Sequence, residues 1–162
     1  MFICEHYFDL MSVKIENIDK LKDLIEREVG VSDWIEVSQS RINQFAEATG
    51  DKQWIHIDAE RARRESPFRQ TIAHGFLTVS LLSELGQSAM EIGGVRMAIN
   101  YGLNRVRFIA PVFADSKIRG RFTLAELEEI KGGTQATWSV TVERENGEKP
   151  CCVAEWLVRY YF

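Results

Sequence analysis

The order of apolar and polar positions changes character about halfway along the chain. In the first half, apolar residues recur at the three- and four-residue spacing of an amphipathic helix. The first such set is Ile15, Ile18, Leu21, Leu24 and Ile25. Gly30 follows where a helix commonly stops, so the pattern predicts a helix that ends near this residue. A short strand is predicted at residues 34–37.

Two shorter helices are predicted next, each from its capping residues. Ser38 or Ser40 can cap a helix that ends at Gly50, since glycine readily adopts the left-handed conformation of a C-cap. Asp58 can cap a short charged helix at residues 59–65, which a following serine–proline pair breaks.

Residues 73–90 form the most apolar helix candidate of the chain. The apolar side chains cover most of the helix circumference: Phe76, Leu77, Val79, Leu81, Leu82 and Leu85. A helix that is apolar nearly all round is a buried helix.

The second half reads as strands. The candidates are residues 95–101, 105–109, 117–128, 135–145 and 151–161, and alternation is clearest where Trp138, Val140 and Val142 are separated by polar residues. Gly132-Gly133 and Asn146-Gly147 are turn signals between strands. Helices followed by an antiparallel meander predict an α+β fold, with about five strands wrapped around the long helix. We expect one domain over residues 1–162, with residues 1–13 as a poorly ordered N-terminal extension.

Composition and charge limit the function classes. The 162 residues are 45% hydrophobic and 27% charged, which is typical of a globular domain, and the net charge of −4 argues against nucleic-acid binding. No apolar run is long enough to span a membrane. The three cysteines indicate neither a disulfide framework nor a zinc site, which favours a reducing cytoplasm.

Two polar stretches could carry chemistry. Asp51 and His56 lie five residues apart in an irregular segment, where a carboxylate and an imidazole can form an acid/base pair; a turn and a packed histidine are the structural alternatives. Gly75 opens the buried helix, so its N–H could stabilise an oxyanion, or the glycine could simply permit close packing. We interpret His74 as a packing residue at the helix terminus. Ser83 lies a little over two turns beyond Gly75, on the same general side.

These residues carry a resemblance to a known family. Gly50-Asp51, His56, the run Ala73-His74-Gly75-Phe76 and Ser83 resemble the MaoC-like (R)-specific enoyl-CoA hydratases of the hot-dog fold. The run at residues 98–108, with Pro111-Val112 after it, is similar to the nodulation protein N-like branch. The resemblance extends from about Ser32 to the C-terminus.

The resemblance implies a site and a reaction. Asp51 and His56 match the catalytic pair, Gly75 matches the glycine whose N–H receives the thioester oxygen, and Ser83 matches a serine near that pair. The reaction adds water across a trans-2-enoyl thioester, and CoA or acyl carrier protein enters as part of the substrate. Neither a metal nor a redox cofactor is implied, and the expected assembly is a homodimer.

One departure and two alternatives accompany this reading. Gln53-Trp54 stands where the family usually has Asn-Pro, and we expect Trp54 to narrow or reline the acyl pocket. A hot-dog thioesterase is one alternative, although Glu84 is the only acidic residue on the buried helix that could act as its nucleophile. A non-catalytic module that binds acyl thioesters is the other.

Overall fold

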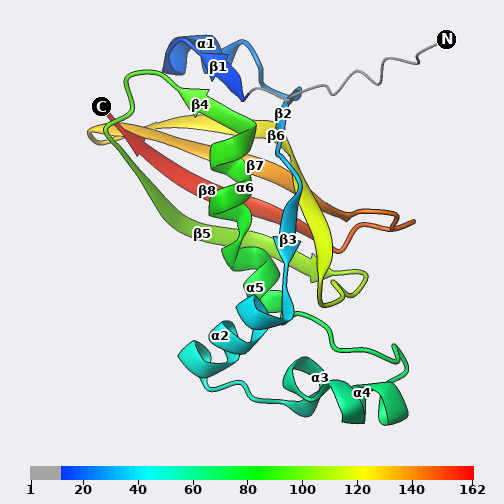
Figure 1. The fold of residues 1–162 in the computed structure, drawn as a ribbon. Coiled ribbons are helices and arrows are strands. Elements are labelled where there is room, and N and C mark those ends of the chain that lie inside the picture. The colour runs from blue at the N-terminus through cyan, green and yellow to red at the C-terminus, as the bar shows by residue number, and fades with distance from the viewer. Residues whose placement is uncertain (1–11) are drawn as a thin grey trace, which may run out of the picture.

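A curved antiparallel sheet wraps around a central helical segment in the computed structural model, which describes residues 12–162 (Figure 1). The strands follow the order β2 (Glu28–Val31), β6 (Ser116–Ile130), β7 (Gly133–Arg144), β8 (Cys152–Tyr161) and β5 (Met97–Phe108). A sixth strand, β3 (Ile35–Val37), pairs with the other end of β6, so β2 and β3 share one edge position. The predicted α+β hot-dog fold, about five strands wide, is confirmed.

The central segment consists of α5 (Gly75–Ser80) and α6 (Leu82–Ala89), separated at Leu81. It crosses the concave face of the sheet (Figure 1), and Leu82 and Leu85 are fully buried there. The prediction that this helix is buried all round is wrong for Phe76, whose side chain is 74% exposed. A single chain covers only the sheet side of the helix, and Phe76 projects beside Phe108 at the free edge of the sheet.

The helix predicted around residues 15–25 is mostly absent. Its residues are divided between β1 (Val13–Ile15), which pairs in parallel with β4 (Met90–Ile92), and the short helix α1 (Ile18–Lys22). The N–H of Glu26 donates to the carbonyl of Leu124 in β6 at 2.7 Å. The chain therefore turns toward the sheet instead of continuing its helical hydrogen bonds.

Gly30 does not stop a helix, because it lies within β2. A Cβ at this position would lie 2.7 Å from the carbonyl oxygen of Ala89. The glycine therefore allows β2 to pass close to the end of α6. The two strands predicted at residues 95–101 and 105–109 are likewise one strand, β5, whose register shifts twice along β8.

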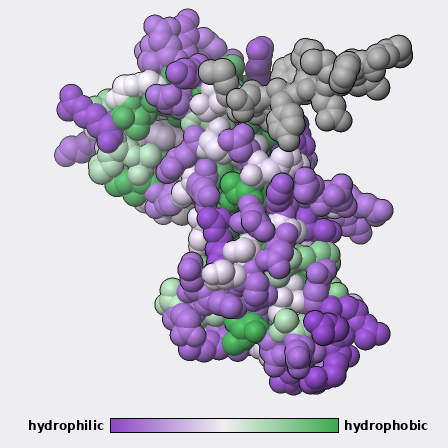
Figure 2. Space-filling model, viewed as in Figure 1, coloured by the Kyte–Doolittle hydropathy of each residue, from purple (hydrophilic) through white to green (hydrophobic). Residues whose placement is uncertain are grey.

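Two helices that lie between β3 and α5 in the sequence begin and end at their predicted capping residues. Ser38 caps α2 (Gln39–Thr49), which ends at Gly50 with φ 78°, and Asp58 caps α4 (Ala59–Glu65). With the single turn α3 (Trp54–Ile57), these helices extend beyond the sheet (Figure 1). Hydrophilic residues gather on the surface over α4 (Figure 2).

The cap of α2 provides a test of this local structure. The Ser38 hydroxyl accepts from the N–H of Arg41 at 3.2 Å, so Ser38→Ala should lower the free energy of unfolding by about 1 kcal/mol. Ser40 is exposed in the first turn and is not the cap, so Ser40→Ala is the matched control with a change below about 0.5 kcal/mol. Urea unfolding measures both; equal losses would contradict the assignment of the cap.

Two further findings concern the N-terminal residues and the length and apolarity of the helices. The extension predicted for residues 1–13 lies almost wholly outside the described residues, and Val13 already belongs to β1. Within residues 12–162, no helix is both long enough and apolar enough to cross a membrane.

Candidate active site

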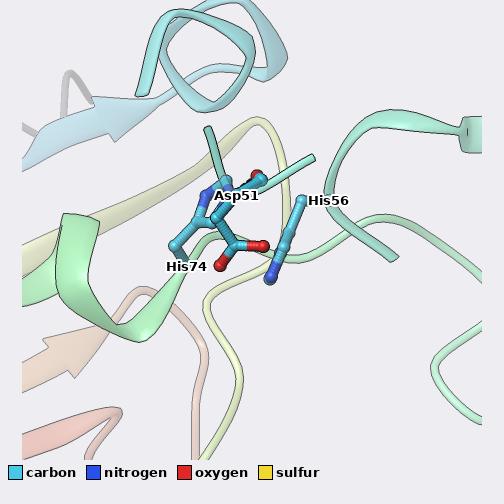
Figure 3. Close-up of side chains that lie close together, drawn as sticks. All are labelled: Asp51, His56 and His74. Carbon is cyan, nitrogen blue, oxygen red and sulfur yellow. Dashed lines mark hydrogen bonds between the residues drawn. The ribbon is translucent and has the colours of Figure 1, made fainter. Parts of the chain in front are cut away.

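The segment after α2 brings Asp51 and His56 together. Gly50 ends α2 in the left-handed conformation, and the single turn of α3 then carries His56 back toward the loop. Asp51 is exposed, whereas His56 is only 7% exposed. The carboxylate of Asp51 points toward the His56 imidazole (Figure 3), and ligand atoms of the two side chains lie within 4.8 Å. An exposed carboxylate beside a buried imidazole can hold a water molecule and exchange a proton with it.

The hydrogen bonding of His56 defines which ring nitrogen is free. Its Nδ1 lies 2.7 Å from the carbonyl oxygen of Ile72. A carbonyl only accepts, so Nδ1–H donates, and in the neutral ring Nε2 is left as a bare acceptor. Burial lowers the pKa of His56, and His74 adds to this, against the raising effects of the Ile72 hydrogen bond and the Asp51 charge. His56 is therefore a neutral base at pH 7.

His74 joins this pair as a third side chain. Its ring stacks on that of His56 with 3.8 Å between centroids and an interplanar angle of 26°. Its Nε2 lies 2.9 Å from the backbone carbonyl oxygen of Asp51. The ring is 2% exposed, as expected of a packing residue, but the sequence did not indicate its contacts with both Asp51 and His56. The position of His74 directly before Gly75 was the sequence signal that could have indicated these contacts.

Gly75 is the first residue of α5, and it shares a cavity with His56. The cavity has a volume of about 310 Å³, and its other lining residues include Phe68, Thr78, Phe108, Ile109 and Cys151. A Cβ on Gly75 would lie 2.7–2.9 Å from the Phe108 ring, so close packing does favour glycine here. The N–H of Gly75 also belongs to the first helical turn, where backbone donors lack intrahelical partners. Packing and oxyanion binding are compatible at this position.

Ser83 lies outside this group. It faces a second cavity of about 340 Å³ between α6, β5 and β8, which is lined mostly by apolar side chains such as Trp138 and Trp156. Its hydroxyl accepts a hydrogen bond from Asn100 Nδ2 at 3.0 Å. Within one chain, the structure thus brings together Asp51, His56 and Gly75 but not Ser83.

Trp54 takes a different place from the one expected for it. The guanidinium of Arg61 lies over its ring, 4.5 Å from the centroid, so the indole packs on α4. Trp54 is not among the residues that line the cavity beside His56. Trp54 therefore contributes to the contact between α3 and α4, and not to the wall of this cavity.

Asp51, His56 and His74 also have the residue types of a metal site. However, His56 Nδ1 and His74 Nε2 are both engaged by carbonyl oxygens. The nitrogen lone pairs lie in the ring planes, so in two stacked rings they lie in nearly parallel planes. Tetrahedral ligation needs the lone pairs to converge on one metal ion. The stacked rings and their hydrogen bonds to backbone carbonyls therefore do not fit a tetrahedral metal centre.

The lowered pKa of His56 predicts a pH effect on stability. In the unfolded chain His56 takes up a proton near pH 6.5, while the folded protein resists protonation until lower pH. The unfolded state therefore binds more protons in this interval, and the free energy of unfolding falls as the pH drops below about 6.5. His56→Gln should weaken this dependence in urea titrations. An unchanged slope would contradict the burial effect on His56.

These features define a class: hot-dog proteins with a carboxylate and an imidazole close together near the start of the central helix. The model of the MaoC-like domain family matches residues 20–146, and the chain belongs to this family. A 3-hydroxyacyl-thioester dehydratase Z of Mycobacterium tuberculosis is 50% identical over 146 residues, covering 90% of this chain and 96% of that protein.

One further relative supports the family, and one solved structure shares the fold. Nodulation protein N of Rhizobium leguminosarum bv. viciae is 49% identical over 141 residues, covering 85% of this chain and 87% of that protein. The unliganded R-hydratase PhaJ1 of Pseudomonas aeruginosa has the same fold, with a TM-score of 0.67 and 21% identity over 85% of this chain and 81% of that one.

Proposed function

We propose that this protein is an (R)-specific hydratase that adds water across a trans-2-enoyl thioester and catalyses the reverse dehydration. The reaction class follows from the family and from 50% identity to a dehydratase: the protein is a hydro-lyase acting on 3-hydroxyacyl thioesters. One observation supports the roles of individual residues. His56, with the Asp51 carboxylate beside it, lines an apolar cavity that also contains Gly75, the first residue of the central helix.

The mechanism adds the water oxygen to C3 and a proton to C2, the two carbons of the double bond. Asp51 and His56 hold a water molecule, and its oxygen attacks C3 as His56 Nε2 accepts a proton from it. The π electrons move toward the thioester oxygen, where the N–H of Gly75 and the helix dipole stabilise the enolate. The pair then returns a proton to C2. CoA or acyl carrier protein takes part only as the substrate's thiol.

A thioesterase mechanism has less support in the structure. Glu84, the acidic side chain available on the central helix, is paired with Arg41 at 3.3 Å and does not line the cavity beside His56. A charged residue held in an ion pair outside the cavity is poorly placed to attack a thioester.

One set of assays separates the three candidate functions. Purified protein is mixed with a short trans-2-enoyl-CoA while the absorbance of the conjugated thioester and the release of free thiol are followed together. A hydratase lowers the absorbance without releasing thiol. Release of thiol would identify a thioesterase, and calorimetric binding with neither change would identify a non-catalytic module.

We also propose that two copies pair through β5. This strand is 12 residues long and has no partner on one side among residues 12–162. It exposes large apolar side chains: Met97, Ile99, Tyr101, Leu103 and Phe108. A long apolar edge invites another strand, and a two-fold axis lets the same edge serve both copies. Light scattering should give twice the chain mass of 18.6 kDa, and Ile99→Lys should reduce it toward one chain. A monomeric wild type would contradict the pairing.

Such a dimer also accounts for the distance of Ser83 from the catalytic pair. Antiparallel pairing places the Asn100 end of one β5 beside the Phe108 end of the other. Phe108 lines the cavity of His56, and Asn100 donates to Ser83. Ser83 of one copy therefore approaches the substrate bound by the other copy.

We place the protein in the cytoplasm as a single domain over residues 1–162. Support comes from two cysteines, Cys151 and Cys152, which are free and buried. Burial raises the pKa of the Cys152 thiol to about 11, so it stays protonated and unreactive at neutral pH.

A further inference from the structure

We propose that His74 is a positioning residue that holds the three reacting groups of the site in one arrangement. The inference rests on the proposed roles of Asp51, His56 and Gly75. His74 contacts Asp51 through a hydrogen bond, contacts His56 through ring stacking, and precedes Gly75 by one peptide bond. These three groups come from segments separated by up to 24 positions in the sequence.

The hydrogen bond is directional. Its acceptor is the backbone carbonyl of Asp51, so the Nε2 of His74 must carry the hydrogen. The interaction fixes the backbone of Asp51 relative to the first turn of α5. The hydrogen bonds of the Asp51 carboxylate and N–H within its loop are both long, at 3.4 Å. The contact with His74 is thus the shorter restraint on this exposed residue.

The opposite nitrogen indicates that the ring is held for this one bond. His74 Nδ1 is buried and has no hydrogen-bond partner among the described residues. A residue selected only to fill space would not need a buried polar atom without a partner, which destabilises a fold relative to an apolar side chain of similar shape. Phe45 packs on the ring of His74 at 5.1 Å between centroids, so part of the surroundings of this ring is apolar.

Stacking supplies the second restraint. The His56 ring is held at one edge by the carbonyl of Ile72 and on one face by the ring of His74. Figure 3 shows the two rings beside Asp51. Together these contacts fix the direction of His56 Nε2, the atom proposed to accept the proton. Misplacement of reacting groups by about 1 Å can lower a rate about 100-fold, so the geometry set by His74 should appear in kcat.

Three variants separate positioning from packing. His74→Phe keeps a stacking ring and loses the donor, whereas His74→Gln keeps an N–H donor near the place of Nε2. We expect kcat to fall about 10- to 100-fold in His74→Phe, with KM changed less than about threefold. The kcat of His74→Gln should be at least about tenfold higher than that of His74→Phe. Phe45→Leu, which loosens the packing on His74 but leaves its hydrogen bond, should keep kcat within about threefold. Thermal unfolding confirms that each variant is folded at the assay temperature.

The result that overturns the proposal is equally defined. If His74→Phe keeps the wild-type kcat, or if the Gln and Phe variants lose kcat equally while folded, the donor of His74 does not position the site. Nitrogen-15 histidine spectra provide a readout that does not depend on turnover. They should show His74 protonated at Nε2 and His56 protonated at Nδ1. The opposite tautomer at His74 contradicts this inference alone, whereas a wild type without turnover contradicts the proposed function.

Discussion

Replacing Asp51 by asparagine lowers kcat for hydration of an enoyl thioester by about 10²- to 10⁴-fold. Asparagine keeps the size of the side chain and can hold a water molecule, but it cannot exchange a proton with it. Stopped-flow or steady-state absorbance of the conjugated thioester measures the loss. His56→Gln should fall in the same range, because the amide cannot accept the proton of the water.

Asp58→Asn is the matched control for this experiment. It removes one carboxylate from the same segment, and asparagine caps α4 about as well as aspartate does. We expect its kcat to stay within about twofold of the wild type. Wild-type turnover in both Asp51→Asn and His56→Gln would contradict the assignment of the catalytic pair.

Phe122→Ala lowers the free energy of unfolding by about 3–5 kcal/mol. Phe122 is fully buried in β6, where it packs edge-to-face on Trp138 at 6.5 Å and against Trp156 at 6.3 Å between centroids. Truncation leaves a cavity between the sheet and α6 that these rigid neighbours cannot close. Urea unfolding at one fixed protein concentration measures the change.

The control for this core variant is Phe162→Ala. Phe162 is 44% exposed at the end of the chain, so its truncation should change the free energy of unfolding by less than about 1 kcal/mol. A loss below 1 kcal/mol in Phe122→Ala would show that the sheet and the central helix do not share the core described here.

Local signals in the sequence predicted the elements that depend on local physics. Ser38, Gly50 and Asp58 define helix ends through short-range hydrogen bonds and backbone conformation, and the structure places the ends there. The strand β7 follows from alternation, since one of its faces is buried. The helix predicted to end near Gly30 fails because contacts distant in the sequence determine this segment. Glu26 donates a hydrogen bond to β6, and Gly30 lies against Ala89.

The site shows the same division. Asp51 and His56 are close in the sequence, so their spacing could suggest a pair. The stacking of His74 on His56 joins residues 18 positions apart, and the intervening path through α4 and Ile72 carries no local signal for it. The exposure of Phe76 was also unpredictable, because hydropathy cannot distinguish an apolar side chain that faces the core from one that stays exposed.

The configuration of the product tests the central claim most directly. Purified protein is given a short trans-2-enoyl-CoA, and the 3-hydroxyacyl product is resolved on a chiral column. The account predicts (R)-3-hydroxyacyl-CoA from the wild type and at most about a hundredth of this amount from Asp51→Asn in the same time. An (S) product, or no product at any chain length, would contradict it.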